Sequence, residues 1–137
     1  MSNLTTALAL IMAIETPNMD SAAIGDLHLP EARRAHGRMQ GRITLINDLR
    51  RWDHNQINWT TDDLHNPELD VLLAYRWLLV QCGSKASVSV YCRTWNGGKR
   101  GRNSDQAWTY YRKAKAAAIF RREHFERCME ETKRRMK

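Results

Sequence analysis

Between Trp95 and Arg122, basic and aromatic side chains are interleaved, and this segment carries the residue types best suited to binding chemistry. It holds one acid, Asp105, and eight basic residues: Lys99, Arg100, Arg102, Arg112, Lys113, Lys115, Arg121 and Arg122. Clustered Lys and Arg are the usual footprint of phosphate binding. Aromatic side chains on the same surface can stack on exposed bases or pack in the core. We expect core packing for Trp95 and Trp108 and phosphate binding for the basic residues.

A second basic group, Arg34, Arg38 and Arg42, recurs at intervals of four residues. If residues 30–52 form one helix, these side chains lie along one line of its surface. They could then meet successive phosphates, or form a solvated face paired with acidic neighbours, and the sequence favours neither alternative. We include them as a second candidate nucleic-acid-binding patch.

Acidic and histidine residues gather between the helices predicted on either side of residues 53–66. They are Asp53, His54, Asp62, Asp63 and His65. Such residues can hold a divalent ion and activate water, as a metal-dependent nuclease requires. Their spacing matches no known metal motif, and Asp62 and Asp63 more simply complement the start of a helix. We therefore expect no metal, no cofactor and no catalytic residue.

The remaining motifs exclude several classes of protein. The sequence has no G-x-S-x-G motif and no P-loop. Three cysteines without C-x-x-C spacing argue against a disulfide framework and a zinc site, and favour a cytoplasmic location. The apolar run 4–14 is too short to span a bilayer, and no basic residue precedes it as in a signal peptide. We expect no membrane partner.

Hydrophobic periodicity predicts an all-α protein, a single helical domain over residues 1–137 built as a small bundle of about four to five helices. The predicted helices cover residues 4–16, 30–52, 66–82, 85–95 and 104–137, with a loop over 17–29. The helix 66–82 is apolar nearly all round, begins at Asn66-Pro67 and ends before Gly83. Such a helix is usually buried on all sides, so it is predicted to be the central core helix.

Two segments are ambiguous. Residues 85–95 match both a helical and a strand pattern; the helix is favoured, and the strand alternative predicts a short β-hairpin near 87–102. The long basic C-terminal helix begins after Asn103 or Ser104, and its apolar seam is interrupted at Arg121 and Arg122. Its end, residues 123–137, is predicted to project from the core or fray.

The predicted order of helix 66–82, helix 85–95, basic loop and helix 104–120 resembles helix-turn-helix DNA-binding domains. The run SDQAWTYYRKAKAA stands where those domains place the recognition helix, and it is also similar to region 4 of sigma factors and to small phage-type late-gene regulators. This resemblance implies base or phosphate contacts by Gln106, Thr109, Arg112 and Lys113. The predicted loop, residues 96–103, is longer than the usual turn of about three to four residues.

Charge distribution favours one function. Residues 84–137 hold fifteen Lys and Arg against five acids, within a chain of net charge +7. We therefore expect a non-enzymatic nucleic-acid-binding protein, with DNA favoured over RNA, acting as a regulator or accessory factor of bacterial or phage type. One alternative is a protein-interaction module, an inhibitor or adaptor that docks on a host protein or forms a homodimer through its first and last helices. A second alternative is a metal-dependent nuclease using Asp62, Asp63 and His65.

Overall fold

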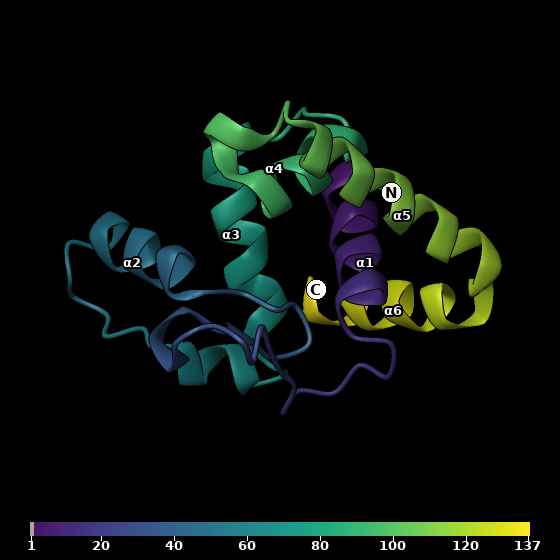
Figure 1. Cartoon of the computed structure of the whole chain (residues 1–137). Coiled ribbons are helices and arrows are strands. Elements are labelled where there is room, and N and C mark those ends of the chain that lie inside the picture. Colours follow the sequence, from purple (N-terminus) through teal and green to yellow (C-terminus); the bar gives the residue numbers. More distant parts are fainter. Residues whose placement is uncertain (1) are drawn as a thin grey trace.

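The computed structural model describes residues 2–137, and most of them are helical (Figure 1). Its six α-helices are α1 (Asn3–Glu15), α2 (Ile43–Trp52), α3 (Asp70–Cys82), α4 (Val88–Gly101), α5 (Asp105–Phe120) and α6 (Arg122–Arg135). Two 3-10 helices, η1 (Glu31–Arg33) and η2 (Thr61–His65), and a two-stranded antiparallel sheet, β1 (Ile24–Gly25) and β2 (Ala35–His36), complete the described chain. The all-α prediction is confirmed, with more helices than expected.

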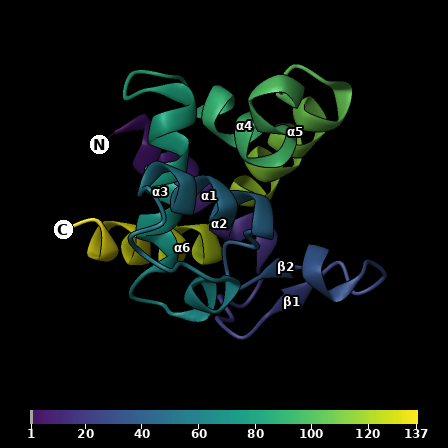
Figure 2. The ribbon, with the colours of Figure 1, turned by 90° about the vertical axis from the view of Figure 1, so that its left-hand side faces the viewer.

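The central helix is α1, and the prediction that residues 66–82 occupy this place is wrong. Helices α3, α4, α5 and α6 all pack against α1, which they surround in Figures 1 and 2. Leu8, Ile11 and Met12 are completely buried. Helix α3 instead leaves Leu72 41% and Val80 55% exposed. Alanines on α1 allow neighbouring helices to approach from every side, whereas one face of α3 meets only water. The apolar face of the first helix is therefore covered by the rest of this chain.

Residues 30–52 do not form one helix, which corrects a second prediction. The segment contains η1, strand β2 and a turn, and becomes α-helical only at Ile43. Gly37 adopts φ +74°, and a Cβ there would lie 2.0 Å from the backbone oxygen of Leu64. The glycine is therefore required by a left-handed turn packed against η2, and a continuous helix is excluded.

Residues 88–101 are helical, so the alternative of a β-hairpin near 87–102 is wrong. The Ser87 side chain caps α4 by accepting a hydrogen bond from the backbone N–H of Val90. The helix is kinked at Gly98, whose φ of 73° a residue with a side chain rarely adopts. The backbone thus leaves helical geometry at Gly98, within the predicted loop 96–103, and a short helical turn then runs to Gly101 before residues 102–104 lead into α5.

The C-terminal segment folds back onto the core, which corrects the prediction that it projects or frays. The chain leaves helical geometry at Arg121, with φ −122° and ψ 51°, at the interruption seen in the sequence. Helix α6 then packs across α1, as Figure 1 shows, and buries His124, Cys128 and Thr132. Helix α6 thereby covers apolar side chains of α1 that would otherwise be exposed to water.

Candidate active site and basic surface

A cleft of about 520 Å³ lies where the C-terminal end of α1 meets α3, α4, α5 and the turn after β2. We call it the Glu15 cleft. Figure 2 shows α4 and α5 on one side of this region and the β1–β2 sheet and α2 on the other. Polar and aromatic side chains line it: Glu15, Asp26, Gln40, Arg42, Thr44, Trp77, Trp95, Asn96, Gln106 and Tyr110. A cleft of this size with convergent polar groups is suited to binding a small molecule or a segment of a polymer.

Glu15 is the residue whose chemistry the cleft changes most. It is the last residue of α1 and follows ten consecutive uncharged residues from Thr5 to Ile14. Burial raises the pKa of its carboxyl group to about 7, a hydrogen bond with Tyr110 partly offsets this, and nearby Asp26 adds to the rise. At neutral pH the carboxyl group is therefore protonated in a large fraction of molecules and can act as a proton donor.

Aromatic residues form one wall of the cleft. Trp77 of α3 and Trp95 of α4 meet edge to face with ring centroids 5.8 Å apart. The Tyr110 hydroxyl is screened from water and has no hydrogen-bond partner of standard geometry among residues 2–137, although it interacts with Glu15. Burial raises its pKa well above the ordinary value. Tyr110 is thus a neutral, buried hydroxyl placed beside the acid.

Two further residues of the cleft hold strained backbone conformations. Asp26 has φ 57° and Gln40 has φ 55°, in the left-handed region that side chains disfavour. Gln40 Nε2 donates to the carbonyl oxygen of Gly37 at 2.7 Å. A Cβ on Gly25 would lie 2.0 Å from Gln40 Oε1, so the glycine makes room for this side chain. Strain of this kind is concentrated at functional sites, because the surrounding structure must stabilise it.

The sequence predictions named two residues of this cleft, Arg42 and Gln106, but as nucleic-acid contacts, and did not predict the cleft itself. Glu15, Asp26, Gln40 and Tyr110 come from segments up to 95 positions apart and share no motif. The available signal was Glu15 itself, because it is the only charged residue of α1, and a carboxylate at a buried helix end must be stabilised by a partner or by protonation. Comparison of the chain with protein families, characterised proteins and solved structures found no match.

The Arg34–Arg38–Arg42 patch does not exist as predicted, because these residues do not share a helix. Arg38 is buried: its Nε donates to Asp70 Oδ2 at 2.6 Å and its Nη1 to Glu131 Oε2 at 2.5 Å. Burial alone would raise the pKa of Glu131, but hydrogen bonds from Arg38 and Arg134 hold it below the ordinary value. Arg38 thereby joins the turn after β2 to α3 and α6.

The other two arginines of that patch serve the loop beside the cleft. The Arg34 guanidinium donates to the backbone oxygens of Leu29, at 3.1 Å, and Leu27, at 3.3 Å. Arg42 forms an ion pair with Asp26. Both arginines thus stabilise the loop beside the cleft, and they do not share one helical face with Arg38.

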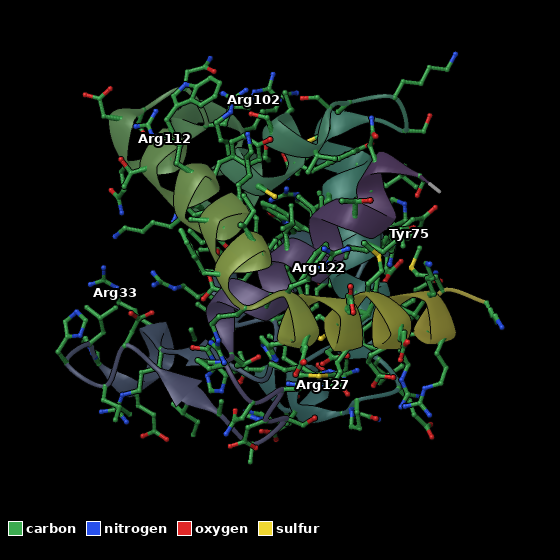
Figure 3. All side chains as sticks on the ribbon, turned by 90° about the vertical axis from the view of Figure 1, so that its right-hand side faces the viewer. Arg33, Tyr75, Arg102, Arg112, Arg122 and Arg127 are labelled. Carbon is green, nitrogen blue, oxygen red and sulfur yellow. The ribbon has the colours of Figure 1, made fainter. Side chains whose placement is uncertain are left out.

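A surface of unpaired basic side chains surrounds the junction of α4 and α5. We define the α4–α5 basic surface as Lys99, Arg100, Arg102, Arg112, Lys113 and Lys115. Arg102 is half-buried and the others are exposed, and none has an acidic partner within 4.0 Å in residues 2–137. Figure 3 shows Arg102 and Arg112 at the same end of the molecule. Gln106 and Thr109 are exposed on the same helix.

Arg93 fixes the connection between α4 and α5 that carries the basic surface, and this role was not predicted from the sequence. It is 6% exposed and donates through Nη1 to the Arg102 backbone oxygen and to Asn103 Oδ1, both at 2.9 Å. Its guanidinium lies 3.8 Å from the ring centroid of Trp108, which is 37% exposed and covers it. The connection between α4 and α5 is therefore held by a buried cation, and Trp108 acts as its lid instead of packing in the core.

Arg121 and Arg122 lie apart from the basic surface. They follow the 16-residue helix α5, about 24 Å from its start at ~1.5 Å per residue. Figure 3 places Arg122 well below Arg102. Arg121 donates to the backbone oxygen of Pro17, and Arg122 pairs with Glu126. The neighbouring Phe120 is 85% exposed, so this corner is partly apolar.

Three of the residues predicted as a metal site, Asp53, Asp63 and His65, form structural contacts. Asp53 pairs with Arg76, which with Trp59 holds the pKa of Asp53 at about 2. Asp63 completes a capping box with Thr60, and His65 contacts His36 with ring nitrogens 3.0 Å apart. Across residues 2–137, no three His, Cys, Asp or Glu side chains are grouped to hold a metal ion.

The cysteines and the helices of the described chain were considered as a reactive thiol site and as membrane-spanning segments. The three cysteines are free, and burial raises the pKa of Cys92 to about 12 and that of Cys128 to about 11. Neither forms a thiolate readily at neutral pH. In the described part of the chain no helix is both long and apolar enough to cross a bilayer.

Proposed function

We propose that the protein is an enzyme that cleaves glycosidic bonds, with Glu15 as its general acid. The observation that carries this proposal is a half-buried carboxyl group with pKa about 7 in an open cleft of about 520 Å³. Breaking the C–O bond of an acetal requires protonation of the leaving oxygen, and a carboxylic acid that stays protonated near neutral pH is the usual donor. The proposal departs from the sequence-based expectation of a non-enzymatic protein.

The lining of the cleft favours a sugar as substrate. Its amide side chains, Gln40, Asn96 and Gln106, each offer both donors and an acceptor, which suits the hydroxyl groups of a sugar. The ring of Trp95 gives an apolar wall against which the C–H face of a pyranose can pack. Tyr110 lies beside the Glu15 carboxyl and interacts with it.

Glycosidic cleavage can be tested with a panel of neutral and cell-wall-derived oligosaccharides, measuring the release of new reducing ends or chain fragments. The wild type is expected to cleave at least one member. Glu15→Gln keeps the shape of the protonated acid but cannot transfer its proton, and should lower kcat by about 10²–10⁴-fold. Glu68→Gln, at an exposed position outside the cleft, is the matched control and should behave as wild type. Equal activity of all three proteins would reject Glu15 as the acid.

Nucleic-acid binding, with DNA favoured over RNA, remains our second candidate function, in which the protein is a regulator or accessory factor. The observation that favours it is the α4–α5 basic surface, whose six cations have no acidic partners in residues 2–137. The N-terminal end of α5, capped by Ser104, adds a partial positive charge at the same place. The three-residue connection 102–104 is compatible with a helix-turn-helix-like use of α5.

The second candidate is tested by fluorescence anisotropy with duplex and single-stranded DNA and with RNA. With four to six phosphate contacts, log K should fall against log salt with a slope of about −4 to −5. Charge reversal at Arg100 and Arg102 should abolish binding. If no nucleic acid binds at low salt, this function is excluded without affecting the assignment of Glu15.

A further inference from the structure

Asp26 is the second carboxylate of the Glu15 cleft, and among the described lining residues these two are the only acids. We propose that Asp26 is the catalytic base that activates water, and that the enzyme is therefore a hydrolase. This inference rests on the proposed glycosidic cleavage and specifies how that reaction is completed.

The position of Asp26 fits this role. Glu15 approaches the cleft from the end of α1, whereas Asp26 approaches from the loop after β1, so the two acids come from different elements. The Asp26 side chain is 27% exposed, which leaves it open to water. Its charge also contributes to the rise in the pKa of Glu15, which places the two groups within electrostatic range. A pair of carboxyl groups around one cleft is the arrangement from which most glycoside hydrolases work.

The surrounding loop holds Asp26 in place at an energetic cost. Its left-handed φ of 57° is kept by a turn in which the Asp26 carbonyl oxygen accepts from the N–H of Leu29 at 2.8 Å. Arg34 clamps the backbone oxygens of Leu27 and Leu29 in the same turn. Arg42 forms an ion pair with the Asp26 carboxylate and so fixes its orientation. A left-handed backbone at Asp26, hydrogen bonds from Arg34 to the following turn and the ion pair with Arg42 together fix the position of Asp26.

The reaction then balances with one water molecule. Glu15 gives its proton to the glycosidic oxygen, the bond from that oxygen to the anomeric carbon breaks, and the leaving sugar departs as an alcohol. Water attacks the anomeric carbon from the other side as its proton passes to Asp26. Release of that proton to solvent and reprotonation of Glu15 restore both carboxyl groups, and the net change is addition of water across the bond.

The first test uses Asp26→Ala, Arg42→Ala and, as a matched control on an exposed acid of the preceding loop, Asp20→Ala. We expect Asp26→Ala to lower kcat by about 10²–10⁴-fold with little change in KM. Added azide should restore turnover in Asp26→Ala by occupying the vacated space, and should yield a glycosyl azide. Arg42→Ala should lose less activity and gain nothing from azide. Equal losses in Asp26→Ala and Arg42→Ala, with no rescue by azide, would assign Asp26 a purely structural role and overturn the inference.

The second test follows the water itself. Cleavage in ¹⁸O-labelled water should place the label at the new reducing end. A product without label, closed by attack of one of the sugar's own hydroxyl groups, would show that no water is activated and would overturn the inference while leaving Glu15 as the acid. If the wild type cleaves no substrate of the panel, the proposed function and this inference both fail.

Discussion

The Glu15 cleft and the α4–α5 basic surface are neighbours that treat charge in opposite ways. The cleft holds few charged groups, and burial changes the chemistry of one of them, raising the pKa of Glu15 to about 7. The basic surface holds six cations that stay exposed or half-buried and have no acidic partners in the described chain. Gly97, Gly98 and Gln106 line the cleft, and Lys99 of the basic surface directly follows the two glycines. A surface with many like charges attracts ligands of the opposite charge, whereas the reactivity of a titratable group depends on its own surroundings.

The largest expected effect separates the two regions by activity. Glu15→Gln should lower glycosidic kcat by about 10²–10⁴-fold, because general-acid catalysis contributes a factor of that size. The same variant should bind DNA with unchanged affinity, since Glu15 is not on the basic surface. Anisotropy and turnover measured on one preparation check both statements. A joint loss of turnover and DNA binding would contradict the separation.

Arg38 carries the largest predicted effect on stability, because it is a buried cation with buried partners. Removing it in Arg38→Ala leaves Asp70 and Glu131 without their main cation. Loss of one partner of a buried pair costs about 3–5 kcal/mol in the free energy of unfolding. Urea unfolding should show this loss, whereas Arg112→Ala, on the basic surface, should change stability by less than about 0.5 kcal/mol. Similar values for both variants would mean that Arg38 is not a structural link.

Glu15 should also make stability depend on pH. Its pKa is about 7 in the folded chain and 4.5 when unfolded. Between these values the unfolded chain releases the proton that the folded chain keeps, so the free energy of unfolding falls as pH rises, by at most about 3 kcal/mol. Relative to wild type, Glu15→Gln should therefore be more stable at pH 8 than at pH 5. Urea midpoints of both proteins at the two pH values measure this, and parallel pH profiles would show that Glu15 is not buried as described.

The smallest expected effect concerns α3. Leu72→Ala should cost less than about 1 kcal/mol, because Leu72 is 41% exposed, whereas Leu8→Ala on α1 should cost about 2–5 kcal/mol. Thermal or urea unfolding of the two variants compares the helix expected to be central with the one that is. A larger loss for Leu72→Ala would restore α3 to the centre of the fold.

Local signals predicted the helices well. Ser104 begins α5, the segment after Gly83 returns to helix, and the interruption at Arg121 and Arg122 marks the bend before α6. These features depend on capping, turn residues and periodicity, which act within a few positions. The same signals misjudged residues 30–52, where Gly37 must adopt a left-handed conformation because the backbone of Leu64 approaches it closely.

The sequence by itself determined that the chain is helical, where some helices begin or end, and that positive charge gathers near α4 and α5. Only the tertiary structure decided which helix is central, which arginines are paired, and that Glu15 meets Asp26, Gln40 and Tyr110 in one cleft. The physical reason is the separation along the chain over which each effect acts. Helix formation and charge density depend on neighbours along the chain, whereas burial, ion pairing and a shifted pKa depend on atoms brought together from distant positions.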